Sequence, residues 1–199
     1  QTSETRSMLR RTFRLHGLPP VCRSLLGYRM DAKQTLGEPR LLISRRALLH
    51  NASLIRQHLS PAVRLCAMIK ADAYGHGADI VADTLANFST RRYEAPLVDA
   101  VAVASIDEAE RLPHTILPVY VLRPVENCFL GRQRSRIEQA IRNGWIMTVC
   151  SGSAADDVAR IATSIGKRAA IQVMVDTGMT RSGVTGEELG GLLDTIESH

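Results

Sequence analysis

The chain has 199 residues, 45% of them hydrophobic and 23% charged, which is typical of a globular domain. Its net charge of +5 is uneven, because residues 1–39 carry seven basic and three acidic side chains and leave the remainder near neutral. This argues against a basic nucleic-acid-binding surface on the body of the chain. No apolar run approaches the roughly 18 residues that span a bilayer, so we expect no membrane partner.

The four cysteines are widely spaced and form no CxxC pair, which indicates a reducing compartment; they are Cys22, Cys66, Cys128 and Cys150. The sequence also has no GxGxxG or P-loop motif, no HExxH motif and no histidines at metal-binding spacing. Nucleotide-phosphate loops and metal sites therefore have no support here. The arginines at 132, 134 and 136 are interpreted as a solvated loop and helix start.

Residues 1–39 form a basic extension in which we expect irregular or disordered structure. They contain Pro19-Pro20 and several glycines and show no sustained periodicity. Their arginine-rich, acid-poor composition resembles an organelle transit segment. The alternative is a mistaken start or upstream read-through, because the chain begins with Gln1.

From residue 40 the pattern becomes regular. In chain order, apolar spacing predicts a strand over 40–44, a helix over 45–59, a strand over 63–69, a helix over 78–88, a strand over 98–104, a helix capped by Ser105 and Glu108, a strand over 116–122, a helix over 134–142, a strand over 145–150, a helix over 154–165 capped by Ser153 and Asp156, a strand over 168–175, and a last helix capped by Thr185 and Glu188.

Five strand–helix repeats from residue 63 onward predict parallel strands joined by crossover helices. Two architectures fit this alternation. One is a doubly wound open sheet, and the other is a (β/α)8 barrel of which five of eight strands are present. Periodicity alone does not choose between them.

Lys70, one of only three lysines, follows a predicted strand at its carboxyl end. Barrels and open α/β sheets both build their sites at this edge. Partial burial disfavours a charged lysine, and the neutral amine attacks aldehydes, so the position suits a Schiff base. Gly75 and Gly77 permit a tight turn, and Tyr74 supplies a hydroxyl able to reach a phosphate. The alternative is a lysine that extends its ammonium into solvent, with Tyr74 as a packing residue.

Arg181 lies in a glycine-containing loop after the strand predicted over 168–175. If the strands are parallel, this loop lies at the same edge as Lys70. A planar, permanently charged guanidinium suits a substrate carboxylate or an oxygen of a cofactor ring. The alternative is a surface arginine paired with Asp176 or Glu187.

Two runs around these residues resemble the motifs of one family. IKADAYGHG at 69–77 closely resembles the lysine signature of the alanine racemases, which bind pyridoxal 5'-phosphate (PLP), and VDTGMTRSG at 175–183 resembles their downstream motif. The runs at 102–112 and 118–124 look like the family's next strands. The resemblance covers residues 40–199 and implies the N-terminal PLP-binding (β/α)8 TIM barrel, with about five of its eight strands.

The resemblance also implies a role for each candidate residue. Lys70 would bind PLP and act as the base on the D-alanine face, Tyr74 would help hold the cofactor near its phosphate, and Arg181 would orient the cofactor and the substrate carboxylate. PLP delocalises the carbanion left when the α-proton is removed, and the protein places one base on each face. The implied function is interconversion of L-alanine and D-alanine for peptidoglycan, by a cytoplasmic homodimer.

This sequence departs from the family pattern in two respects. The family's second base is a tyrosine from a C-terminal β-domain, and we expect this chain to lack that domain and the last three barrel strands. Residues 1–199 alone are then expected to be inactive and poorly stable, because two sheet edges and the core stay open. Many members also carry a lysine seven residues before the motif arginine, where this chain has Met174.

Two other classes of function remain open. The first is a PLP-binding homeostasis protein or an inactive pseudo-enzyme with the same barrel, which keeps Lys70 but needs no second base. The second is an α/β interaction or structural domain in which the lysine is incidental. Failure of Lys70 to bind PLP favours the second class.

Overall fold

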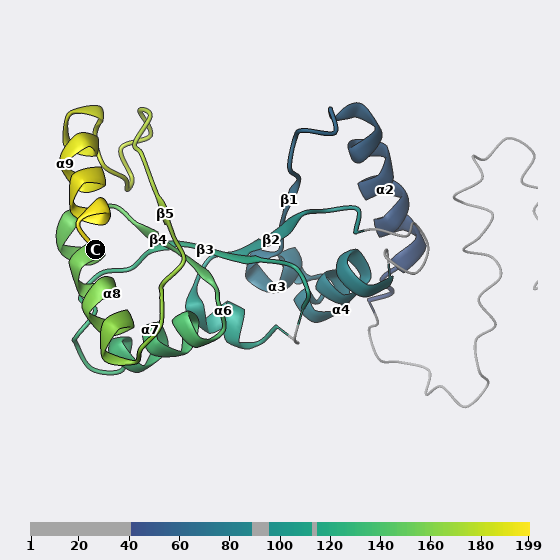
Figure 1. Cartoon of the computed structure of the whole chain (residues 1–199). Coiled ribbons are helices and arrows are strands. Elements are labelled where there is room, and N and C mark those ends of the chain that lie inside the picture. The colour runs from purple at the N-terminus through teal and green to yellow at the C-terminus, as the bar shows by residue number, and fades with distance from the viewer. Residues whose placement is uncertain (1–40, 89–95, 113–114) are drawn as a thin grey trace, which may run out of the picture. The chain divides into compact units, whose positions relative to one another are not determined.

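A computed structural model describes residues 41–88, 96–112 and 115–199 (Figure 1). All of these residues except Leu41 belong to one compact unit, Leu42–His199. The basic extension predicted over residues 1–39 lies outside the described residues. In chain order the elements are α2 (Arg45–His58), β1 (Cys66–Met68), α3 (Lys70–Gly75), α4 (Ala78–Asp83), the π-helix η3 (Thr84–Phe88), β2 (Ala100–Val103), α6 (Ile106–Glu110), β3 (Val119–Pro124), α7 (Gln133–Arg142), β4 (Ile146–Val149), α8 (Gly152–Ser164), β5 (Ile171–Val173) and α9 (Gly186–Glu197).

The five strands form one parallel sheet in the order β1-β2-β3-β4-β5. Each strand pairs with its neighbour in sequence, and the order never reverses. A doubly wound sheet contains a point at which the order reverses, whereas a barrel adds successive strands in one direction. The topology therefore decides between the two predicted architectures, and the fold is a partial PLP-barrel-type (β/α) sheet with five parallel strands.

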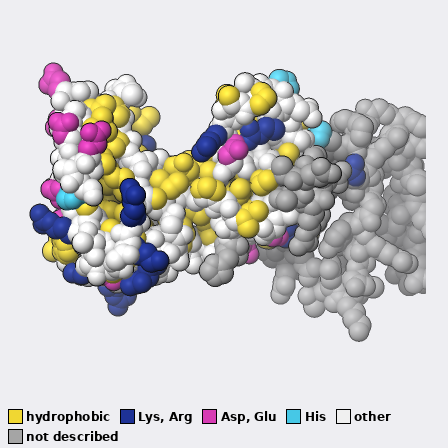
Figure 2. Space-filling model, viewed as in Figure 1, with side chains coloured by type: hydrophobic (Ala, Val, Ile, Leu, Met, Phe, Trp, Pro, Cys, Tyr) yellow, Lys and Arg dark blue, Asp and Glu magenta, His cyan; other side chains and the backbone are white. Residues whose placement is uncertain are grey.

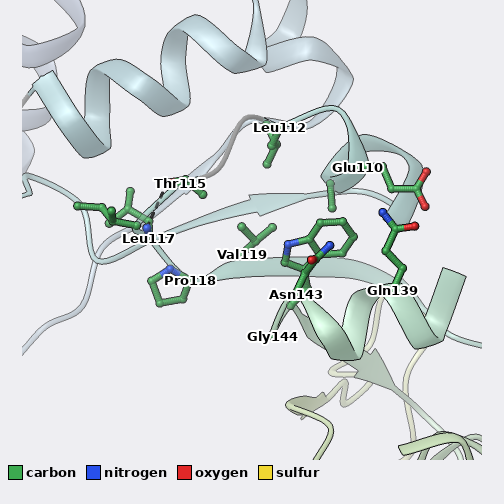
Figure 3. Close-up of a pocket in the computed structure, with 12 residues that line it drawn as sticks. Glu110, Leu112, Thr115, Leu117, Pro118, Val119, Gln139, Asn143 and Gly144 are labelled. Atoms are coloured by element: carbon green, nitrogen blue, oxygen red, sulfur yellow. Dashed lines mark hydrogen bonds between the residues drawn. The ribbon is translucent and has the colours of Figure 1, made fainter. Parts of the chain in front are cut away.

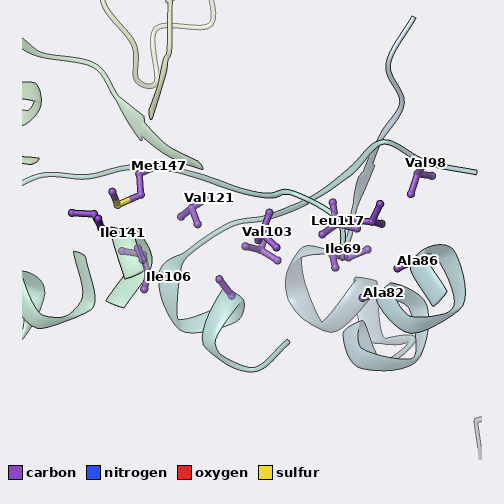
Figure 4. Close-up of a cluster of buried hydrophobic side chains, with 14 of the residues drawn as sticks. Ile69, Ala82, Ala86, Val98, Val103, Ile106, Leu117, Val121, Ile141 and Met147 are labelled. Atoms are coloured by element: carbon purple, nitrogen blue, oxygen red, sulfur yellow. The ribbon is translucent and has the colours of Figure 1, made fainter. Parts of the chain in front are cut away.

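A hydrophobic core lies between one face of this sheet and the helices (Figure 4). The strands contribute fully buried side chains such as Val103, Val121 and Met147, and helices α6 and α7 contribute Ile106 and Ile141. Burial of one such side chain stabilises the fold by about 1.5–3 kcal/mol. The predicted alternation of strands and helices thus forms a two-layer arrangement that fixes the ends of the strands.

The other face of the sheet is open. Side chains that alternate with the core residues line a hollow of about 350 Å³ on this face, among them Cys66, Met68, Tyr120, Leu122 and Gln172. Figure 2 shows hydrophobic side chains gathered over the middle of the sheet. In a closed barrel the corresponding face becomes the packed interior.

The strand predicted over 40–44 is wrong for the residues that the structure describes. Residues 41–44 adopt no strand, and Leu41 and Leu42 are each 68% exposed. A strand needs a neighbour for its backbone groups, and none of the described strands pairs with this segment. Ser44 instead caps α2, where its hydroxyl accepts a hydrogen bond from the Ala47 amide at 3.2 Å.

The predicted order of the other elements is confirmed, although each strand is shorter than expected and the helix over 78–88 is completed by a π-turn. The capping box of Thr185 and Glu188 is present in full at the start of α9.

The cap predicted at Ser153 is wrong by two residues. Because β4 ends at Val149, the backbone at Ser151 is still extended, and its hydroxyl accepts from the Ala154 amide at 3.2 Å.

Candidate active site

The candidate residues lie at the carboxyl edge of the parallel sheet. Lys70 begins α3 directly after β1, and Arg181 lies in the loop that joins β5 to α9. Because all five strands run in the same direction, both segments leave the sheet at the same edge. Three strands separate β1 from β5, so the two residues stand at opposite ends of the strand order.

The turn that carries Lys70 is left-handed. Four consecutive residues other than glycine, Ala71, Asp72, Ala73 and Tyr74, have φ between 51° and 55° and ψ between 39° and 49°. In L-amino acids this conformation costs about 1–2 kcal/mol per residue, hence roughly 4–8 kcal/mol for the turn. Strain of this kind persists only where the surrounding structure over-determines it, and it concentrates at functional sites.

Hydrogen bonds close the left-handed turn at both ends. The Ala73 amide donates to the carbonyl of Ile69 at 2.9 Å, and the Gly77 amide donates to the carbonyl of Asp72 at 2.9 Å. The carboxylate of Asp72 accepts from the Ala78 amide at 2.7 Å and so joins the turn to the start of α4. Gly77 has φ +85°, a conformation that favours glycine.

The amine of Lys70 and the hydroxyl of Tyr74, which both belong to this turn, are available to bind a ligand. Lys70 is half-buried, and Tyr74 is 60% exposed. Among residues 41–88, 96–112 and 115–199, neither the amine nor the phenol takes part in a hydrogen bond or ion pair. An amine partly removed from water beside a free phenol can bind a ligand that carries a carbonyl and an anionic group.

The Arg181 loop is built around Asp176. The carboxylate of Asp176 accepts hydrogen bonds from the amides of Thr180 and Gly178, each at 2.9 Å. These two bonds hold the pKa of the Asp176 carboxyl below its ordinary value, and the bond from Thr180 has the larger effect. The alternative ion pair between Arg181 and Asp176 is absent from the described residues, and the Asp176 carboxylate instead accepts from the backbone of the loop. Glu187 likewise forms no ion pair within the described part of the chain.

The loop returns against the end of β5. The Asp176 amide donates to the carbonyl of Val184, and the Val184 amide donates to the carbonyl of Met174, each at 2.9 Å. Gly183 sits so close to this strand that a Cβ there would lie 2.6 Å from the Asp176 nitrogen. Arg181 is exposed on the loop, and no residue in the described ranges forms an ion pair with it. Its guanidinium is therefore free to meet an anionic ligand.

The side chain of Met174, the residue at which the sequence departs from the family motif, makes one polar contact with this loop. Its sulfur accepts a hydrogen bond from the Ser182 hydroxyl at 3.3 Å. A thioether is a weak acceptor and carries no charge. The side chain at this position therefore supports the Arg181 loop only by packing and one weak bond, in addition to the backbone bond between Val184 and Met174.

The thiol of Cys150, which follows β4 at the same edge, is a poor nucleophile. Burial, the largest cause, and the nearby Glu126 carboxylate raise the pKa of this thiol above its ordinary value, although a hydrogen bond with the Gly183 backbone opposes them. The thiolate is the reactive form of cysteine, and it is scarce at neutral pH under these conditions.

Sequence reasoning missed the role of Glu108. The predicted capping box pairs Glu108 with Ser105, and the Ser105 hydroxyl does accept from the Glu108 amide at 3.3 Å. The carboxylate of Glu108 does not complete the box. It accepts from the amides of Ala71 at 3.2 Å and Ala104 at 2.7 Å. The sequence did offer one signal of this role, because Glu108 lies about one helical turn beyond the carboxyl end of β2, the strand next to β1.

A larger hollow, of about 730 Å³, lies at the opposite, amino edge of the sheet (Figure 3). The start of β3, the end of α6 and the segment before β4 line it, and Figure 3 shows Glu110, Gln139 and Asn143 at its polar end. Neither Lys70 nor Arg181 lines this hollow. Residues at the amino edge of barrel strands usually serve stability, so we do not assign it to the site.

Within the described ranges, no group of three or more histidine, cysteine, aspartate or glutamate side chains could hold a metal ion. No helix in this part of the chain has the length and hydropathy needed to cross a bilayer.

Comparison with known proteins points to the family that the motifs resemble. The family pattern described as "Alanine racemase, N-terminal domain" matches residues 43–199. The alanine racemase of Chlorobaculum tepidum is 38% identical over 159 residues, which are 79% of this chain and 38% of the relative. The chain thus spans about two fifths of the length of the curated relatives that it matches.

Solved structures give the same result. The alanine racemase of Clostridium difficile 630 has a TM-score of 0.60 and 31% sequence identity, and the match covers 78% of this chain and 37% of that one. The alanine racemase of Bartonella henselae with covalently bound pyridoxal phosphate has a TM-score of 0.58 and 25% identity, over 78% of this chain and 40% of that one.

Proposed function

The chain belongs to the alanine racemase family through its N-terminal domain, and from this premise we propose that it is the PLP-binding barrel of an enzyme that interconverts L-alanine and D-alanine. The observation that carries the proposal is the left-handed turn Lys70–Gly75, which presents an unpaired amine at the carboxyl edge of the sheet. A strained turn with an available lysine favours a binding site over an incidental lysine.

The side chains at this edge fit PLP by their chemistry. PLP bears an aldehyde, a phosphate and a phenolic oxygen, and the edge offers an amine, a phenol and a guanidinium. Lys70 would bind the aldehyde carbon, and Tyr74 would donate its hydroxyl proton to the phosphate. Arg181 would pair with the phenolic oxygen or with the substrate carboxylate, for which its planar fork of donors is suited.

PLP, when bound, supplies an electron sink that stabilises the negative charge left on the α-carbon after proton removal. The residues of the chain then perform the remaining tasks. The amine of Lys70, displaced from the aldehyde carbon by the amino group of the substrate, would accept the α-proton on one face of the substrate and, in the reverse direction, would donate a proton to the α-carbon on that face. Arg181 fixes the substrate carboxylate so that the α-hydrogen faces that amine.

Racemisation requires a second base on the opposite face of the α-carbon. Neither Tyr74 nor Arg181 can supply it, because both have binding roles in this proposal. We assign that base to the part of the relatives that this chain does not span. We assign the last barrel strands and the β-domain to the same part. Residues 40–199 would then bind PLP without turning over alanine. Normal racemase turnover by the 199-residue chain would contradict this assignment.

The proposed activity also implies a cellular location and a partner. D-alanine formed in this way would supply peptidoglycan, and the partner would be a second copy of the protein that completes the site. A reducing cytoplasm fits the described cysteines, because Cys66, Cys128 and Cys150 are all free thiols.

The proposal is tested by titrating the purified chain with PLP and following the absorbance band of the lysine-bound cofactor. The wild-type chain and Lys70→Ala are compared with Lys167→Ala, which removes an exposed lysine from the amino end of β5. We expect the band in the wild type and in Lys167→Ala and its loss in Lys70→Ala. Equal bands in all three proteins would refute the role of Lys70.

The same titration distinguishes the rival functions. A PLP-binding homeostasis protein or pseudo-enzyme gives the Lys70-dependent band, but a protein extended to the relatives' length then shows no racemase activity. An α/β interaction domain with an incidental lysine gives no Lys70-dependent band in either length of protein.

A further inference from the structure

The hydrogen-bond ladder between β1 and β2 ends in an unusual way. Met68 lies opposite Ala102, and the Ile69 amide donates to the carbonyl of Ala102 at 2.8 Å, as a parallel ladder requires. The next bond of the ladder would join the Ala104 amide to the carbonyl of Ile69. That carbonyl accepts instead from the Ala73 amide, which closes the left-handed turn.

The carboxylate of Glu108 takes the place of the missing ladder bond. One of its oxygens accepts from the Ala104 amide at 2.7 Å, at the end of β2. The other oxygen accepts from the Ala71 amide at 3.2 Å, at the first left-handed residue of the turn. One half-buried side chain on α6 therefore satisfies two backbone donors that belong to two neighbouring strand ends.

We propose that Glu108 is a positioning residue that holds the Lys70–Gly75 turn in its left-handed form and thereby fixes Lys70 and Tyr74 in the geometry that binds PLP. Because Ala104 is satisfied by the carboxylate, the carbonyl of Ile69 is left for Ala73. Without the carboxylate, the amides of Ala104 and Ala73 compete for one carbonyl. The inference rests on the proposed function of Lys70 and adds a residue that touches neither cofactor nor substrate.

The replacement Glu108→Gln tests this role with almost no change of shape. Both backbone partners are donors, so only a group with two acceptor oxygens can satisfy both. A glutamine offers one acceptor and turns its NH2 group toward the other donor. The matched control is Glu110→Gln on the same helix, because Glu110 is exposed and forms no hydrogen bond within the described part of the chain.

Two readouts are measured on the 199-residue chain. The first is backbone amide hydrogen exchange over residues 69–77 and 100–106 without PLP, and the second is the apparent dissociation constant for PLP from the absorbance band. In Glu108→Gln we expect about tenfold faster exchange at Ala71 and about tenfold weaker PLP binding, since hydrogen bonds to charged groups are among the stronger ones. Glu110→Gln should match the wild type in both readouts.

Each other outcome has a distinct meaning. Unchanged exchange and unchanged PLP binding in Glu108→Gln would overturn the inference. Faster exchange with unchanged binding would also overturn it, because the contact would then be structural only. If the wild type shows no Lys70-dependent band, the proposed function fails, and exchange at Ala71 still reports whether the carboxylate holds the turn.

A milder variant covers the case in which Glu108→Gln does not fold. Glu108→Asp keeps the charge but shortens the side chain by one methylene group, so it cannot span both amides. We expect it to lose the longer bond, to Ala71, and to show faster exchange there, while the Ala104 amide keeps its protection. Full protection of Ala71 in this variant would overturn the proposal.

Discussion

Gly183 is the residue at which the Arg181 loop leaves no room for a side chain. Its φ is +120°, and a Cβ would lie 2.6 Å from the nitrogen of Asp176 and 2.8 Å from the carbonyl carbon of Val175. Both neighbours are backbone atoms of the segment that pairs with Val184, so neither can move without breaking the loop. The position thus fixes the path by which Arg181 reaches the carboxyl edge.

We therefore predict that Gly183→Ala lowers the free energy of unfolding by about 1–3 kcal/mol, measured by urea denaturation. The control is Gly190→Ala in α9, where a Cβ meets no atom within 4 Å and the backbone is an ordinary helix. That change should raise stability by about 0.5–1 kcal/mol. A Gly183→Ala chain as stable as the wild type would contradict the described loop.

Asp176 makes the same loop sensitive to acid. The amides of Thr180 and Gly178 hold the pKa of its carboxyl below the ordinary value, so the folded state favours the charged form. A group of this kind adds stability that is fully present above its unfolded-state pKa and is lost as the pH falls through its folded-state pKa. The loop should therefore be best formed at neutral pH.

The corresponding test compares the wild type with Asp176→Asn, which keeps an acceptor oxygen but carries no charge. We expect the wild type to be the more stable protein at pH 7 in urea denaturation. The difference should shrink as the pH falls below 3.8, the ordinary carboxyl value. A difference that stays constant from pH 7 to pH 3 would show that the charge of Asp176 does not support the loop.

At the scale of secondary-structure elements, helix starts depend on where the preceding strand ends. Spacing alone placed the cap of α8 at Ser153, but β4 ends at Val149 and the backbone is still extended at Ser151. Ser151 therefore accepts the bond from Ala154, whereas Ser153 already lies inside the helix. The register of a cap is set by the strand before it, which the local sequence does not reveal.

This register gives a paired prediction for α8. Ser151→Ala should lower the melting temperature and cost about 1 kcal/mol, because the amide of Ala154 loses its acceptor. Ser153→Ala should have a smaller effect, since it removes only the contact between the Ser153 and Ser151 hydroxyls at 3.2 Å, and alanine is a good helix residue at an exposed position. Thermal denaturation of both variants checks the prediction. The reverse ranking would favour the cap predicted from sequence.

The order of strands and helices was predictable from sequence because it depends on local periodicity. The left-handed turn was not, because Ala71 and Ala73 favour right-handed helix when considered alone. Its backbone is satisfied by the carboxylate of Glu108 on α6 and by the carbonyl of Ile69, which directly precedes the turn. Lys70, Tyr74 and Arg181 were found from motifs, whereas Glu108 required the three-dimensional arrangement.

At the scale of the whole unit, the five strands bring the site to one edge but leave one face of the sheet open. The hollow of about 350 Å³ on that face is lined by side chains such as Met68, Tyr120 and Leu122. Strand order, which sequence periodicity could not supply, is what identifies the partial barrel. The chain spans about two fifths of its relatives' length and contains the residues proposed to bind PLP.

Reductive trapping shows directly whether Lys70 binds PLP. The 199-residue chain is incubated with PLP, reduced with borohydride and digested, and the modified lysine is identified by mass spectrometry. We expect the label on the peptide that contains Lys70 and none on Lys167, which is exposed and has no comparable turn. Equal labelling of Lys70 and Lys167, or labelling of Lys167 or Lys33 without Lys70, would contradict the assignment.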